Sequence, residues 1–145
     1  MSISLEQLDI IDLISEKHSL LRSRIDTRWN AQSDIHLANS EWYILSRIVD
    51  APATIAEISK TVAISRQAIH KFIRQLEQKG LINVFDMKDS KKLKGVEMTQ
   101  LGRECYQRYD ELKQEIITEI VSIIGEDNKR LFEKLLRQPW FKEAL

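Results

Sequence analysis

Residues 54–99 constrain the fold of this chain more than any other stretch, because they combine two helix starts, a helix stop and two short apolar runs. Thr54 and Glu57 have the spacing of a capping box, in which a hydroxyl and a carboxylate accept hydrogen bonds from backbone N–H groups. Ser65 is in position to cap a second helix, and Gly80 is in position to end it. The sequence therefore predicts a short helix, a tight connection and a longer helix.

The longer helix is predicted to have two contrasting faces. At about 100° per residue, four apolar side chains fall within one arc that is expected to enter the core. They are Ile69, Phe72, Ile73 and Leu76. The opposite arc carries amide and cationic side chains, with no aspartate or glutamate near its centre. It consists of Gln67, Lys71, Arg74 and Gln78, with Arg66 and His70 at its flanks.

Two β-type runs follow at residues 81–85 and 96–99, and a lysine-rich segment, DMKDSKKLKG, lies between them. We expect this segment to be the turn-rich tip of a β-hairpin. Helix, connection, helix and hairpin in this order are the layout of a winged helix-turn-helix, in which the hairpin is the wing. The expected fold class is therefore mainly α with one small β-hairpin.

Further helices are predicted on both sides of the winged unit, from apolar residues at helical spacing. They span residues 5–30, with Ser4 as N-cap, 41–50, with Asn39 or Ser40 as N-cap, 100–124 and 128–137. The first helix is too long to be covered by the winged unit alone, so its apolar face is expected to pack against a second subunit or against the C-terminal helices. Trp140 and Phe141 are expected to dock as well.

With 145 residues, the chain is expected to form a single domain over residues 1–145. Its two prolines and four glycines favour long helices over a β-sandwich. No apolar run approaches the roughly 20 residues that span a bilayer, and the N-terminus lacks a basic leader, so we expect a cytoplasmic protein without membrane contact. The one cysteine, Cys105, excludes an internal disulfide and fits a reducing compartment.

The net charge of zero hides a segregation of charge along the chain. Residues 54–96 carry nine basic and four acidic side chains, a net charge of +5. Residues 1–53 carry five and eight, a net charge of −3, and residues 97–145 carry eight and ten, a net charge of −2. The basic stretch coincides with the predicted winged unit, as expected for an electrostatic footprint on nucleic acid.

The polar face of the longer helix suits the major groove of DNA, where Arg and Lys pair with guanine and Gln pairs with adenine. Hydroxyls at helix starts can meet phosphates, and wing lysines can follow the backbone or enter the minor groove. Any solvated helix has a charged face. Here the charged face occurs together with the helix caps, the predicted hairpin and the local positive charge, and this combination favours DNA binding. The candidate DNA-binding residues are Thr54, Ser65, Arg66, Gln67, His70, Lys71, Arg74, Lys88, Lys91, Lys92 and Lys94.

The segment SRQAIHKFIRQLEQKGLI, residues 65–82, resembles the recognition helix and first wing strand of the MarR family. MTQLG, residues 98–102, falls where that family passes from the wing to its long fifth helix. The resemblance implies a winged core over residues 37–99 and helical dimerisation regions over residues 1–36 and 100–145. It also implies a homodimer that binds a palindromic operator, represses transcription and lets go on binding a small phenolic or lipophilic molecule or on oxidation.

The wing departs from the family pattern. Members usually carry an Asp-x-Arg pair whose arginine enters the minor groove, whereas here Asp89 and Ser90 are followed by Lys91 and Lys92. Lysine lacks the planar fork of arginine, so the wing is expected to read DNA less specifically.

The resemblance implies an effector pocket where the first, second and fifth helices meet. The candidate lining residues are Trp29, Trp42, Tyr43, Tyr106 and Tyr109, all of which suit a plain core or an interface equally well. Cys105 occupies an apolar position, where a thiol is usually inert. His18, His36 and His70 lie in separate segments, so no metal or cofactor is expected, although His18 could contribute to a zinc site as in metal-sensing relatives.

The residues are compatible with three function classes. The favoured one is a DNA-binding transcriptional regulator. The alternatives are a winged-helix protein-interaction module without DNA readout, or a regulator that senses oxidants or metals. An enzyme is disfavoured, because no Ser/His/Asp grouping, glycine-rich phosphate loop or pair of catalytic carboxylates has local support.

Overall fold

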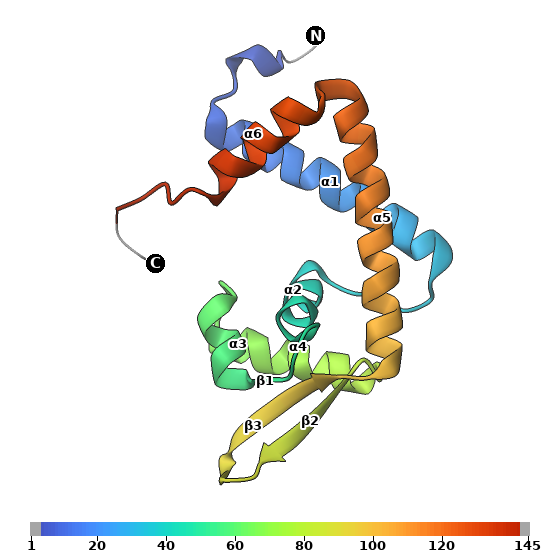
Figure 1. Cartoon of the computed structure of the whole chain (residues 1–145), viewed down its shortest axis with the longest axis vertical. Helices are drawn as coiled ribbons and strands as arrows, with labels where there is room; N and C mark the ends of the chain where they lie inside the picture. The colour runs from blue at the N-terminus through green and yellow to red at the C-terminus, as the bar shows by residue number, and fades with distance from the viewer. Residues whose placement is uncertain (1–3, 143–145) are drawn as a thin grey trace.

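The computed structural model of the chain describes residues 4–142, apart from the side chains of Ser90 and Lys91. In chain order its elements are the 3-10 helix η1 (Leu5–Gln7), α1 (Ile10–Gln32), α2 (Asn39–Ile48), β1 (Ala53–Thr54), α3 (Ile55–Thr61), α4 (Arg66–Gln78), β2 (Ile82–Met87), β3 (Ser90–Met98), α5 (Gln100–Ile124) and α6 (Glu126–Arg137). The fold is mainly α with a small antiparallel sheet, which confirms the predicted class (Figure 1).

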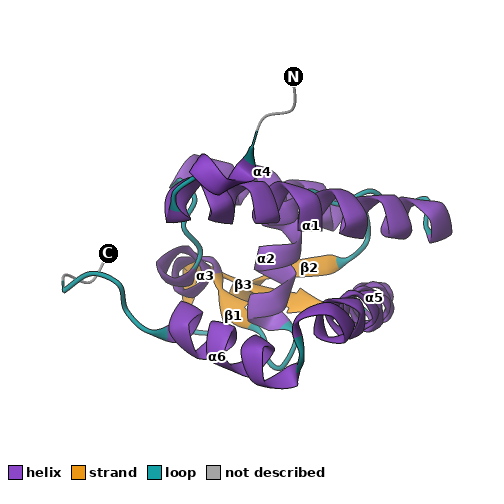
Figure 2. Cartoon of the chain, turned by 90° about the horizontal axis from the view of Figure 1, so that it is seen from above, coloured by secondary structure: helices purple, strands orange, loops and turns teal. Residues whose placement is uncertain are grey.

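Helix α5 connects two parts of the molecule (Figure 1). Its first turns lie beside α2, α4 and the sheet, from which the β2–β3 hairpin projects. Helix α1 crosses α5, and α6 folds back from the far end of α5. Viewed from above, α1 and α6 lie apart on opposite sides of the molecule (Figure 2). No helix within residues 4–142 is long and apolar enough to cross a membrane.

The core is densest where α2, α3, α4 and the sheet meet. Its completely or almost completely buried apolar residues are Ile44, Leu45, Ile48, Ile58, Ile69, Leu76, Leu81, Ile82 and Val96. On α4, three of the four apolar residues predicted to face inward are buried, and Phe72 is half-buried. The opposite face of α4 is thereby left toward solvent.

The caps predicted for the helix-turn-helix are confirmed. The Thr54 hydroxyl accepts from the Glu57 N–H at 3.1 Å, and the Ser65 hydroxyl accepts from the Ala68 N–H at 3.2 Å. The carboxylate half of the predicted capping box differs, because the Glu57 carboxylate accepts from the Thr54 hydroxyl at 3.1 Å rather than from the Thr54 backbone N–H. Gly80 follows α4 with a φ of +76°, a left-handed conformation that favours glycine.

The sheet has the strand order β1-β3-β2 and differs from the predicted hairpin in two ways. Strand β1 was missed, because two residues are too short to give a periodic pattern. The segment predicted to be a turn-rich tip is mostly strand, since β3 begins at Ser90 and carries Lys92 and Lys94. Two strands pair through hydrogen bonds between their backbones, which do not require apolar side chains. The side chains of Lys92 and Lys94 are exposed, so lysine is tolerated at these positions of β3.

The N-terminal helix also begins later than predicted. Ser4 caps only the 3-10 turn, by accepting from the Glu6 N–H at 3.2 Å. Helix α1 starts at Ile10, because Asp9 offers a second cap and accepts from the Asp12 N–H at 2.9 Å. The apolar spacing continues through both segments, so it gave no sign of the break between them.

Helices α2 and α6 begin two residues earlier than predicted. At α2 the N-cap position is Ala38, whose N–H donates to the Glu41 carboxylate at 2.9 Å. A glutamate in the first turn thus takes the place of the expected Asn39 or Ser40 cap. Helix α6 starts directly after Gly125, whose φ of +88° reverses the chain between α5 and α6.

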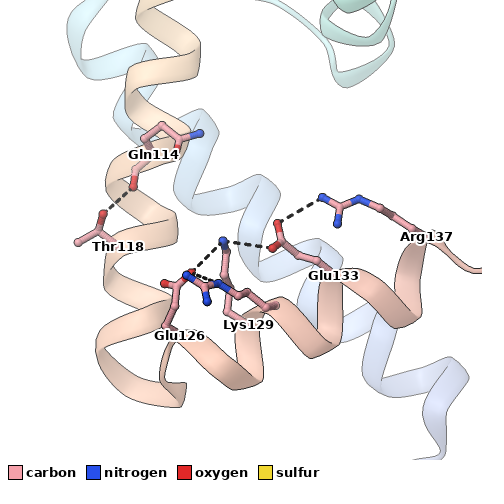
Figure 3. A network of polar contacts seen from close by, with 7 residues as sticks. Gln114, Thr118, Glu126, Lys129, Glu133 and Arg137 are labelled. Carbon is pink, nitrogen blue, oxygen red and sulfur yellow. Dashed lines mark hydrogen bonds and ion pairs between the residues drawn. The ribbon is translucent and has the colours of Figure 1, made fainter.

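Helix α6 has one charged and one apolar face. Its charged residues pair along the helix, with Lys129 between Glu126 and Glu133, and Arg137 bound to Glu133 (Figure 3). The other face carries Leu131, Phe132, Leu135 and Leu136, each between 45% and 54% exposed. Most of the charged face is thus paired within the helix, whereas the apolar face is uncovered in the single chain.

The aromatic residues after α6 are also uncovered in the single chain. Trp140 is 52% exposed and Phe141 is 74% exposed, so the expectation that they dock is not met within one chain. The Trp140 indole N–H donates to the Leu135 carbonyl at 2.8 Å, which holds the ring beside the apolar face of α6.

Candidate nucleic-acid interface

The outward face of α4 presents the side chains that the sequence indicated. Ser65, Arg66, Gln67, His70, Lys71 and Arg74 are all exposed. They are held outward because Ile69, Ile73 and Leu76 on the other side of the helix are buried. The face is about the right width for a major groove, since it belongs to a single α-helix.

A groove of about 270 Å³ separates α4 from the wing. It is lined by residues from three elements: Thr54, Ile55, Ala56 and Ser59 around α3, Arg66 and His70 on α4, and Lys92, Leu93 and Lys94 on β3. The structure thus brings five of the predicted DNA-binding residues to one hollow. Hydroxyl, imidazole, guanidinium and ammonium groups along it can all donate to phosphate oxygens.

A second hollow continues along α4 beside the groove. His70, Arg74 and Lys94 line it together with Glu77 and Asp86. The two carboxylates lie on the predicted DNA-binding surface but were not singled out from the sequence. Asp86 comes beside Lys94 through the register of β2 and β3, which no alternation in this part of the sequence indicates.

The wing lysines differ in their surroundings. Lys88 is exposed at the turn, and Lys92 is exposed on β3. Lys94 forms an ion pair with Asp86, and both side chains are about half exposed. The Lys91 side chain lies outside the described residues. Any phosphate that binds Lys94 therefore has to compete with the Asp86 carboxylate.

Two close contacts fix the wing and α4 relative to α5. A Cβ on Gly102 would lie 2.2 Å from the Leu81 carbonyl oxygen, so only glycine lets α5 approach the residue before β2 this closely. The Thr99 hydroxyl donates to the Gly80 carbonyl at 2.6 Å and accepts from the Gly102 N–H at 3.0 Å. One threonine thus caps α5 and holds the turn at the end of α4.

Four of the five candidate effector-binding aromatics form one cluster between α1, α2 and α5. Trp29 meets Trp42 edge to face at 5.0 Å, and Tyr109 stacks on Trp42 at 3.8 Å. Tyr106 lies at the margin, 6.2 Å from Tyr109, and burial raises the pKa of its phenol. Tyr43 is 48% exposed and no ring contact joins it to the cluster.

A separate cavity of about 370 Å³ lies between the end of α1 and the outer side of α5. Trp29, Ile35 and Cys105 form part of its lining, with Arg108 and Glu111 nearby. Cys105 is only 7% exposed, and burial raises the pKa of its thiol. A buried thiol with a raised pKa is a poor nucleophile at neutral pH. Within residues 4–142, no group of three or more potential ligands could hold a metal ion.

Comparison with known proteins agrees with this geometry. Residues 33–86 match the sequence model of the MarR family. The transcriptional regulator BldR from Sulfolobus solfataricus shares the fold over 94% of this chain and 96% of its own, with a TM-score of 0.73 and 20% sequence identity. MepR from S. aureus, in a complex with DNA, shares the fold over 90% of this chain and 95% of its own, with a TM-score of 0.76 and 19% identity.

A third structure of the same fold is BpsR from Bordetella bronchiseptica, whose DNA binding is regulated by 6-hydroxynicotinic acid. It covers 94% of this chain and 96% of its own, with a TM-score of 0.75 and 14% identity. No curated protein sequence matches the chain.

The family match spans the helix-turn-helix and most of β2, and the shared fold extends over nearly the whole chain. BldR, which shares this fold, is a transcriptional regulator, and MepR, which shares it too, is seen in a complex with DNA. Residues 33–86 are therefore similar to the MarR family in sequence, and the chain as a whole has the winged helix-turn-helix fold of transcriptional regulators such as BldR and MepR.

Proposed function

We propose that the protein acts in the cytoplasm as a homodimeric repressor, which binds a palindromic DNA operator and is released by a small aromatic or lipophilic molecule. The observation that carries the proposal is the continuous surface formed by the outward face of α4, the start of α3 and the lysines of β3. Recognition residues on α4 would enter the major groove, and the wing would follow the adjacent backbone.

The roles proposed for individual residues follow from their positions. Gln67, Lys71 and Arg74 are exposed on the side of α4 opposite its buried residues, where a helix in the groove meets base edges. Ser65 and Thr54 sit at helix starts, where phosphates bind. The remaining candidates, namely Arg66, His70, Lys88, Lys91, Lys92 and Lys94, are assigned to phosphates or to the minor groove.

Homodimerisation is supported by the apolar surface at the end of the molecule away from the wing. Ile10 and Ile11 at the start of α1 are 65% and 71% exposed, and the apolar face of α6 is open as well. Exposed apolar patches of this kind mark protein interfaces, and most soluble oligomers are symmetric homodimers. Two copies joined through α1, α6 and the Trp140 segment would present two recognition helices to one duplex.

The proposed effector site is the aromatic cluster of Trp29, Trp42, Tyr106 and Tyr109. Stacked and edge-on rings that carry two phenol groups match the chemistry of a small aromatic molecule with a polar substituent. BpsR, of the same fold, responds to a hydroxylated aromatic acid. Because the rings already fill the space between them, a ligand would have to displace at least one of them.

The proposal is tested by selecting duplexes from a random pool with the purified full chain, followed by fluorescence anisotropy with the selected duplex at increasing salt. A regulator of this kind selects a palindrome, binds it as a dimer and loses affinity steeply as salt rises. Failure to enrich any sequence, combined with salt-independent binding or none, would favour the protein-interaction module instead.

A further inference from the structure

We propose that Glu41 and Lys79 position the recognition helix α4 for sequence readout, and that they couple it to the aromatic cluster through the α1–α2 loop. This inference rests on the proposed function, because it concerns how the DNA-binding face is held. Neither residue lines the groove between α4 and the wing. Lys79 contributes to the net positive charge of residues 54–96, but its side chain is only 31% exposed and its ammonium group is bound to Glu41.

Lys79 is the C-cap of α4, so it moves with the end of the recognition helix. Its ammonium group bonds to both carboxylate oxygens of Glu41, at 2.9 and 2.7 Å, and to the carbonyl oxygen of His36 at 2.7 Å. An ammonium group has three donors, and here each has an acceptor. The end of α4 is therefore fixed to the start of α2 and to the loop before it.

Glu41 is 2% exposed and is the one buried charged residue among those described in residues 4–142. Its carboxylate also accepts from the Ala38 N–H at 2.9 Å. A buried carboxylate is costly unless it is paired and hydrogen-bonded, and this one is both. An apolar pair of similar volume would stabilise a fold at least as well, so stability alone does not explain the ion pair.

The same loop is attached to the aromatic cluster. The Trp29 indole N–H donates to the Ile35 carbonyl at 2.7 Å, next to the His36 carbonyl that Lys79 binds. Trp42, the residue after Glu41, packs edge to face on Trp29 and stacks on Tyr109. A shift of either indole would thus move the acceptors of Lys79, and with them the end of α4.

The opposite side of the α4 terminus is held independently. The Leu81 N–H donates to the Leu76 carbonyl at 3.0 Å, and the Thr99 hydroxyl donates to the Gly80 carbonyl. The first bond closes the turn at the end of α4, and the second attaches this turn to the N-cap of α5, so both remain when the ion pair is removed. Loss of the ion pair is therefore expected to alter the angle of α4 rather than to unfold the winged unit.

The test uses the full chain with Glu41→Gln and Lys79→Met together, so that no unpaired charge is left buried. The amide oxygen introduced by Glu41→Gln can still accept from the Ala38 N–H, and methionine keeps an apolar stem. The control is Arg28→Met with Glu119→Gln, which removes another bidentate tertiary ion pair, between α1 and α5. The two probes are a duplex selected by the wild-type protein from a random pool and a scrambled duplex of equal composition.

The expected result is that the ratio of affinities for the selected and scrambled duplexes falls about tenfold, as when one bidentate base contact is lost. Affinity for the scrambled duplex should be unchanged, because the phosphate contacts remain. The control should keep the wild-type ratio. Simple destabilisation would lower both affinities together, so the ratio separates positioning from a structural role.

An unchanged ratio in a folded double variant would overturn the inference while leaving the proposed function intact. If the wild-type protein selects no sequence, the proposed function fails first and the inference fails with it. If the double variant does not fold, Lys79→Arg replaces it, because it keeps the charge but changes the donor geometry. That variant should also lower the ratio with its melting temperature retained, and a wild-type ratio would contradict the inference.

Discussion

Trp42 and Tyr109 stack with their ring centroids 3.8 Å apart and their planes 4° from parallel. Trp42 belongs to α2 and Tyr109 belongs to α5, so this contact joins the winged unit to the helix that leads to α6. Arg22 on α1 donates to the Tyr109 hydroxyl at 3.1 Å, which brings a third helix to the same place. Any molecule that parts these rings would act on three helices together.

The ring contact predicts a large effect on stability. Trp42→Ala should lower the free energy of unfolding by about 3–5 kcal/mol, because it removes a large side chain that is 2% exposed. Tyr43→Ala, at the exposed neighbouring position, should change it by less than about 0.5 kcal/mol. Urea unfolding followed by circular dichroism measures both variants. Equal losses would mean that the cluster is not a packed core.

Arg74 is predicted to contact the major groove. Arg74→Ala should weaken binding to a selected duplex by about 1–3 kcal/mol, the range for a bidentate base contact. The dimer should persist, because Arg74 is exposed on α4 away from α1 and α6. Fluorescence anisotropy and analytical ultracentrifugation provide the two measurements. Wild-type affinity in this variant would show that the reading face is assigned wrongly.

The ion pair between Asp86 and Lys94 is predicted to restrain DNA binding. Asp86→Asn should free the ammonium group for a phosphate, raise the affinity for duplex DNA and increase the salt dependence by about 0.9 in log–log slope. Asp127→Asn on α6 is the matched control and should leave both quantities unchanged. A lower affinity in Asp86→Asn would indicate that the carboxylate instead orients Lys94 productively.

The apolar face of α6 is predicted to lie in the dimer interface. Leu135→Glu should dissociate the dimer, because it places a charge on a face that is otherwise Leu131, Phe132 and Leu136. Arg130→Glu puts a carboxylate on the charged face of the same helix and should leave the dimer intact. Sedimentation velocity distinguishes the two. Dimers in both variants would place the interface elsewhere.

The features that could be predicted from the sequence are those that local chemistry determines. The caps at Thr54 and Ser65 and the stop at Gly80 each depend on a few neighbouring residues, and all three are confirmed. The exposed face of α4 could be predicted for the same reason, because it lies opposite the apolar residues of that helix that are buried. The uneven distribution of charge along the sequence indicated that the basic surface belongs to the winged unit. This inference required no tertiary contact to be known.

The features that could not be predicted depend on partners distant in the chain. Lys79 looks like one more surface lysine until Glu41, 38 residues earlier, is brought beside it. Tyr43 and Tyr106 have the same side chain, yet of the two only the Tyr106 ring contacts the Trp42 ring. The extent of β3 was missed because backbone pairing carries it through lysines that show no apolar alternation.

The salt dependence of DNA affinity tests the central claim most directly. If α4 and the wing bind the duplex through cationic side chains, log K should fall linearly with log salt, by about 0.9 for each phosphate contacted. With several contacts in each subunit, affinity for a selected palindrome should drop at least about a thousandfold between roughly 50 and 200 mM salt. An affinity that does not change over this range, or no binding at low salt, would contradict the account.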